Sequence, residues 1–204
     1  MGPELARSFS DREVPSHDEK WHEAVGMFRS GDRAGALFLF QRLAKEGCSP
    51  ALVEIGNIYE QGGGGIERDV DKAIEWYSRS VKVLDDPKAH LGLGRLYLQC
   101  GKTDDDYFNA YHHFSLLEST QEMGAFYGLG VIHDLGLGVS RDTVVAVRYY
   151  QQACQLGHVL AARNLARITL KSNPFKGIVL WLISCWKIWR LALKNPSDPR
   201  LSIY

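Results

Sequence analysis

The chain has 204 residues, and it lacks the sequence features of several large classes of protein. Its 24 Lys and Arg residues are balanced by 24 Asp and Glu residues, so there is no excess of positive charge to coat nucleic acid. The first twenty residues contain no apolar run of the kind expected in a secretory signal peptide. Its four cysteines lie far apart with no C-x-x-C pair, which fits neither a zinc module nor a disulfide framework. We expect reduced thiols in a cytoplasmic chain.

The patterns of common catalytic, metal and cofactor sites are also missing. The glycine run at 62–65 is followed by no Lys-Ser or Lys-Thr pair, so it predicts a turn between helices rather than a phosphate-binding loop. The acidic run at 104–106 lacks the rest of a calcium-loop pattern. His112 and His113 are adjacent, about 100° apart on a helix, which prevents them from sharing a metal ion. We therefore predict no catalytic, cofactor or metal-binding residue, and a protein that is not an enzyme; a small hydrolase on a repeat scaffold is the less favoured alternative.

What the chain does contain is an internal repeat. Four aspartates are separated by 37, 37 and 36 residues, and each is followed four residues later by alanine and eight residues later by an aromatic residue. On a helix, Asp is placed to cap the first turn, while Ala and the aromatic share one buried face. The positions are Asp32, Ala36 and Phe40; Asp69, Ala73 and Tyr77; Asp106, Ala110 and Phe114; and Asp142, Ala146 and Tyr150.

A glycine recurs in the helical segment that precedes each of these from the second copy on. Gly56, Gly94 and Gly130 each lie five residues after an alanine. A glycine within a helix costs about 1 kcal/mol relative to Ala, so its recurrence at a fixed phase predicts backbone-to-backbone packing at that point. The unit is a helix, a loop and a second helix, about 36 residues long, and such units stack as a solenoid.

These units resemble Sel-one-like repeats, a family related to tetratricopeptide repeats, over residues 18–171. The resemblance implies an all-α, right-handed helical-repeat solenoid of nine to ten helices. It also implies a role as a scaffold for protein partners, of the kind found in signalling and in bacterial cell-envelope or exopolysaccharide machinery. The best-matching copy contributes Ala51, Ile55, Gly56, Tyr59, Gly62, Asp69, Lys72, Ala73, Trp76 and Tyr77.

We expect four segments: a flexible N-terminal arm (1–17), the helical repeats (18–171), a terminal hydrophobic helix (172–194) and a C-terminal tail (195–204). In a helical solenoid, the first helices form the inner surface on which partners bind. The predicted partner-binding residues on that surface are Glu54, Asn57, Glu60, Arg95, Gln99, Tyr127, His133, Arg163 and Arg167. Simple solvation is the alternative interpretation of most of them.

The terminal helix departs from the repeat pattern. Adding 36 to the last aromatic position gives residue 186, which predicts that Trp186 fills the aromatic site of a fourth repeat. The basic residues lie in one narrow stripe on a helical wheel, and nearly all the rest is apolar. The residues predicted to meet a membrane or a partner are Lys176, Trp181, Trp186, Lys187, Trp189, Arg190 and Lys194.

Three interpretations of this helix stay open. Its uncharged stretch from 177 to 186 has ten residues, against the roughly 20 that a transmembrane span needs. It suits an anionic membrane surface, a contact with a protein partner or a second copy, or a cap on the preceding repeat. We expect a non-enzymatic adaptor that binds protein partners, not nucleic acid, in the cytoplasm or peripherally on the inner membrane face. A soluble structural subunit that uses the helix as an oligomer or partner interface is the alternative.

Overall fold

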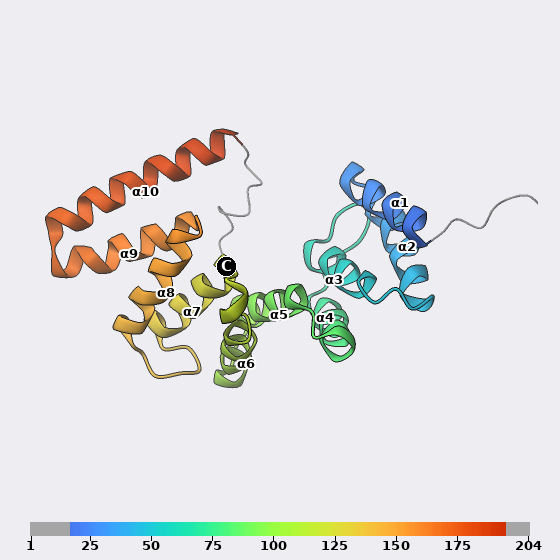
Figure 1. The fold of residues 1–204 in the computed structure, drawn as a ribbon, viewed down its shortest axis with the longest axis horizontal. Helices are drawn as coiled ribbons and strands as arrows, with labels where there is room; N and C mark the ends of the chain where they lie inside the picture. Colours follow the sequence, from blue (N-terminus) through green and yellow to red (C-terminus); the bar gives the residue numbers. More distant parts are fainter. Residues whose placement is uncertain (1–16, 195–204) are drawn as a thin grey trace, which may run out of the picture. The chain divides into compact units, whose positions relative to one another are not determined.

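The computed structural model describes residues 17–194 and contains ten α-helices, one short 3₁₀ helix and no strand within that range. This confirms the predicted all-α repeat fold (Figure 1). The elements are α1 (His17–Ser30), α2 (Arg33–Lys45), α3 (Ala51–Gln61), α4 (Val70–Leu84), α5 (Pro87–Cys100), α6 (Asp104–Ser115), η1 (Glu118–Thr120), α7 (Met123–Leu135), α8 (Thr143–Gln155), α9 (Val159–Ser172) and α10 (Pro174–Lys194).

The described chain forms two compact units that divide after residue 83. In the first unit, α1 and α2 are joined by a tight turn, and their apolar faces close over α3 around the buried Phe40 and Ile55. In the second unit, successive helices pack as the pairs α5–α6, α7–α8 and α9–α10. Helix α7 is buried on nearly every side, because it lies at the centre of this unit's core.

Aspartates cap the second helix of three repeats, as predicted. The side chains of Asp32, Asp69 and Asp142 accept hydrogen bonds from backbone N–H groups of the first turn at 2.9–3.0 Å. The prediction is wrong for Asp106, because Thr103 is the N-cap of α6 and Asp106 closes a capping box from the third helical position. The role of the aspartate changes because this helix begins three residues earlier in the repeat.

Each recurring glycine packs directly against the aromatic ring of its own repeat. A Cβ atom at any of the three positions would lie 2.6–2.7 Å from a ring carbon, closer than any real contact. All three rings are almost completely buried. The pairs are Gly56 with Tyr77, Gly94 with Phe114 and Gly130 with Tyr150. The prediction of backbone-to-backbone packing is wrong here, because the neighbour of each glycine is a side-chain ring. The glycine makes room for the aromatic residue that fills the core of each repeat.

The glycine run between α3 and α4 is a turn, as predicted. Gly62, Gly63, Gly64 and Gly65 all have positive φ angles, between 59° and 92°. This left-handed backbone is open to glycine without steric cost.

Helix α10 does not follow the register of the repeat. Asn173 alone separates it from α9, and its Oδ1 accepts a hydrogen bond from the N–H of Lys176 at 3.0 Å. The prediction for Trp186 is wrong: this side chain is 54% exposed, whereas the other aromatic positions are buried. The physical reason is the short turn, which starts α10 only 31 residues after the start of α8 and shifts its register. Gly177 and Ser184 face α9 instead, and a Cβ at Gly177 would lie 2.5 Å from the Cα of Leu170.

Candidate docking surface on α9 and α10

Helices α9 and α10 form an antiparallel hairpin whose charge has one sign (Figure 1). Residues 159–194 contain seven Lys and Arg residues and no Asp or Glu. The seven are Arg163, Arg167, Lys171, Lys176, Lys187, Arg190 and Lys194. The carboxylate-free stretch is longer still, since no Asp or Glu occurs between Asp142 and Asp198. Such a hairpin favours anionic partners.

The outer face of α10 carries large apolar side chains in contact with solvent. Phe175 is 81% exposed, Trp189 is 62% exposed and Leu193 is 67% exposed. Others on this helix that are at least 41% exposed are Ile178, Val179, Trp181, Leu182, Ile183 and Trp186. A run of this length is unusual on a monomeric surface and marks a site of interaction. No helix within residues 17–194 is both long enough and apolar enough to span a bilayer.

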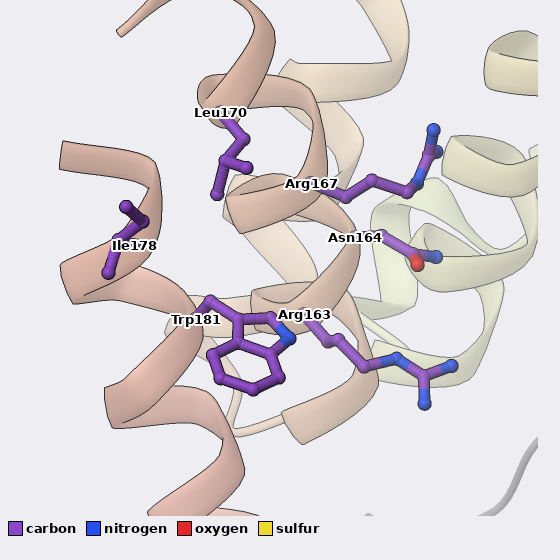
Figure 2. Close-up of a pocket in the computed structure, with 6 residues that line it drawn as sticks. All are labelled: Arg163, Asn164, Arg167, Leu170, Ile178 and Trp181. Atoms are coloured by element: carbon purple, nitrogen blue, oxygen red, sulfur yellow. The ribbon is translucent and has the colours of Figure 1, made fainter. Parts of the chain in front are cut away.

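A pocket of about 520 Å³ opens between the two helices. Arg163, Asn164, Arg167 and Leu170 line it from α9, and Ile178 and Trp181 line it from α10. Figure 2 shows the three polar side chains leaving α9 on one side, with the amide of Asn164 between the two guanidinium groups. The pocket therefore joins a polar wall of N–H donors to an apolar wall.

A buried hydrogen-bond network supports the polar wall from beneath. Asp134 of α7 is 3% exposed, pairs with the guanidinium of Arg167 and accepts a hydrogen bond from the Tyr150 hydroxyl at 3.4 Å. Asn164 donates from Nδ2 to the hydroxyl oxygens of Tyr150 at 3.2 Å and Tyr127 at 3.5 Å. Burial, with the nearby Asp134 carboxylate, raises the pKa of Tyr150, so its hydroxyl stays protonated and able to donate. Two pocket residues are thus held in place by the core of the preceding repeat.

Sequence and structure comparisons identify the repeats. The Sel1 repeat model matches residues 49–82 and 125–158. The chain contains Sel1 repeats. Proteins with Sel1 repeats are typically scaffolds for protein–protein interactions, and the family is generally non-catalytic.

Relatives and solved structures agree with this assignment. The chain is 32% identical over 100 residues to the ERAD-associated E3 ubiquitin-protein ligase component HRD3B of Arabidopsis thaliana, covering 48% of the chain and 15% of that protein. It spans less than a third of the length of the curated relatives that it matches.

Two solved structures share the fold. The protective antigen c5321 of uropathogenic Escherichia coli, which has an SLR fold, is 20% identical with a TM-score of 0.71, covering 84% of the chain and 42% of that protein. A Sel1 repeat protein from Oxalobacter formigenes is 18% identical with a TM-score of 0.69, covering 95% and 87%.

The predicted inner-surface residues of the Sel1 repeats fall into separate groups. Glu54, Asn57 and Glu60 form a half-buried chain in the first unit, where Asn57 donates to Glu54 and the Tyr77 hydroxyl contacts both Asn57 and Glu60 at 2.7 Å. In the second unit Gln99 is exposed and Arg95 is half-buried.

The remaining predicted residues lie on α7 and α9. His133 packs between the rings of Tyr111 and Tyr149, with centroids 5.8 Å from each. Tyr127 is 5% exposed, and its ring stacks on that of His158. Arg163 and Arg167 are brought together at the pocket. The sequence did not indicate that Asn164, Leu170 or Ile178 lines a site. Asp134 could have been found from the repeat, because it occupies the same repeat position as the predicted residue Glu60.

Buried histidines in the Sel1 repeats predict acid sensitivity. His90, which is 4% exposed, donates from Nε2 to Asp85 at 2.8 Å. Its Nδ1 then accepts a hydrogen bond from the Nδ1–H of His113 at 2.9 Å. Burial, with the neighbouring His90 and His112, lowers the pKa of His113 to about 4. Burial alone lowers the pKa of His158 to about 4. Both rings are therefore held neutral in the folded chain.

The free energy of unfolding should fall as the pH drops below about 6.5. In that range the two histidines bind protons in the unfolded chain but stay neutral in the folded chain. We expect a loss of about 1–2 kcal/mol for each of His113 and His158 between pH 7 and pH 5. Urea unfolding of His158→Gln should show a smaller difference between the two pH values than the unmodified chain. The exposed His22 is the control, and an equal pH difference in His22→Gln and His158→Gln would contradict this assignment.

Proposed function

We propose that this chain is a non-catalytic adaptor that holds a protein partner on its Sel1 repeats and is placed at the cytoplasmic face of an anionic membrane by α10. The observation that carries the membrane part is the outer face of α10. It combines exposed Phe and Trp side chains with the basic residues Lys176, Arg190 and Lys194, all exposed. Apolar rings enter the boundary between head groups and acyl chains while basic side chains meet anionic head groups.

The adaptor part rests on the repeats themselves. One relative is named as a component of an E3 ubiquitin-protein ligase, and this name is consistent with a partner-binding role. Within residues 17–194, no cluster of three or more His, Cys, Asp or Glu side chains is arranged to hold a metal ion. The stacked helices supply a preorganised surface, which lowers the entropic cost of binding a partner.

Vesicle flotation tests the membrane part. The full chain should float with phosphatidylcholine vesicles that contain phosphatidylglycerol, float poorly with pure phosphatidylcholine, and dissociate as salt is raised. Trp186→Ala/Trp189→Ala should weaken vesicle binding by about tenfold or more, since each ring buries a large apolar area in the interface. Phe108→Ala on α6 removes an exposed aromatic side chain outside α10 and should leave binding unchanged.

A protein interface is the second candidate for α10. Exposed Trp and Arg side chains, such as Trp186 with Arg190 stacked over its ring at 5.3 Å, are also the residues enriched in interface hot spots. This candidate would replace the membrane proposal if the chain bound neither kind of vesicle and sedimented as a defined oligomer. The double variant Trp186→Ala/Trp189→Ala should then sediment as a monomer.

A further inference from the structure

The pocket between α9 and α10 has the chemistry of an amphiphilic anion. We propose that it binds one molecule of an anionic phospholipid, with the phosphate at Arg163 and Arg167 and an acyl chain along Leu170, Ile178 and Trp181. This inference rests on the proposed function, because it assumes that α10 lies at an anionic membrane surface. It adds a specific lipid site to that general surface contact.

The two guanidinium groups supply the donors for a phosphate, because the N–H groups of Asn164 already donate to the hydroxyl oxygens of Tyr127 and Tyr150. Arg163 and Arg167 are exposed, and Figure 2 shows their guanidinium groups on either side of the Asn164 amide. Arg167 contacts Asp134 through Nη2. A guanidinium has five N–H donors, so this contact is compatible with a phosphate held through the others. The Asp134 carboxylate is buried below the wall and presents no charge to the opening.

The apolar wall continues the outer face of α10. Ile178 and Trp181 line the pocket and are still 50% and 47% exposed. A lipid layer that covers the outer face of α10 would therefore also reach the pocket. An acyl chain could pass from that layer into the pocket without crossing a polar surface. Burial of such a chain removes apolar surface from water, which favours binding.

Charge complementarity favours a phosphate at this place. No carboxylate occurs in the sequence from 143 to 197, so none lies on α9 or α10 to repel an anion. An acidic peptide would match the charge as well. The lipid is favoured because the pocket opens onto the apolar face that we place at the membrane.

Binding of a soluble short-chain lipid to the full chain tests the proposal. Dihexanoylphosphatidylglycerol, kept monomeric, should shift the indole N–H signal of Trp181 in a saturable way, with the signal identified from Trp181→Phe. Arg163→Gln should weaken this binding by about tenfold, since it removes a charge-assisted hydrogen bond to the phosphate. Lys88→Gln removes one exposed positive charge from α5, outside the hairpin, and should leave the affinity unchanged. Inorganic phosphate and dihexanoylphosphatidylcholine should bind far more weakly.

Several results would overturn the lipid site. Equal weakening by Arg163→Gln and Lys88→Gln, equal binding of the two lipids, or binding of phosphate as tight as that of the lipid would each do so. Tighter binding of an acidic, leucine-containing peptide at the Trp181 signal would assign the pocket to peptides. Vesicle binding without binding of the short-chain lipid would overturn the lipid site alone. Binding of the short-chain lipid without vesicle binding would overturn the membrane part of the proposed function alone.

Discussion

Gly130→Ala should lower the free energy of unfolding by about 2 kcal/mol, although alanine is the better helix former. The new Cβ would lie 2.6 Å from Cδ1 of Tyr150, whose ring is 1% exposed and fixed by hydrogen bonds at its hydroxyl. The ring has nowhere to move, so the helices α7 and α8 must separate. Overpacking of this kind costs about 3 kcal/mol, which exceeds the gain of about 1 kcal/mol in helix propensity.

Gly26→Ala is the matched control. Gly26 lies within α1, and a Cβ there would meet nothing within 4 Å. This substitution should raise the free energy of unfolding by up to about 1 kcal/mol. Urea unfolding followed by circular dichroism would measure both variants. Two stabilised variants would mean that the contact of Gly130 with Tyr150 is looser than described.

Asp134→Leu should lower the free energy of unfolding by about 3 kcal/mol. The substitution removes the buried partner of Arg167 and the acceptor of the Tyr150 hydroxyl. Leucine itself fits this environment, because the middle repeat has Leu98 at the same position, 9% exposed. The cost therefore comes from the polar groups that lose their partner.

The middle repeat also indicates how to restore stability. It pairs Leu98 with Phe114, whereas the outer repeats pair Glu60 with Tyr77 and Asp134 with Tyr150. Asp134→Leu/Tyr150→Phe would rebuild the apolar pair, and it should recover about 1 kcal/mol or more of the loss in Asp134→Leu. Urea unfolding of both single variants and the double variant gives the coupling energy. Additive effects of the two substitutions would contradict a direct interaction.

The parts of the fold that could be predicted are those that one repeat encodes by fixed spacing. Gly130 and Tyr150 recur at the same spacing in each copy, so the periodicity indicated that both positions are tightly packed. It did not indicate that the two contact each other. The Asp142 cap is equally local, since it involves only the next three residues. These features need no knowledge of how one unit packs on another.

The parts that could not be predicted depend on loop length and on packing between helices. To predict which way Trp186 faces, one must know the length of the turn at Asn173, and a period of 36 residues does not determine that length. Thr103 and Asp106 are both residues that can serve as an N-cap, and the spacing alone does not decide between them. In the structure Thr103 is the N-cap of α6. The pocket depends on how α10 packs on α9, where Gly177 lies against Leu170, and no repeat pattern contains that contact.

Because no carboxylate lies between Asp142 and Asp198, acid and salt should affect the second unit in different ways. The stretch contains no carboxylate to take up a proton in mildly acidic solution, and His158 stays neutral down to about pH 4. Electrostatic binding through this stretch should therefore be nearly constant across that range. It should respond to ionic strength instead, because the screening length shrinks to about 10 Å at 0.1 M salt. A fall in pH should therefore destabilise the fold without weakening the electrostatic attraction to an anionic partner. A rise in salt concentration should release such a partner and leave the fold intact.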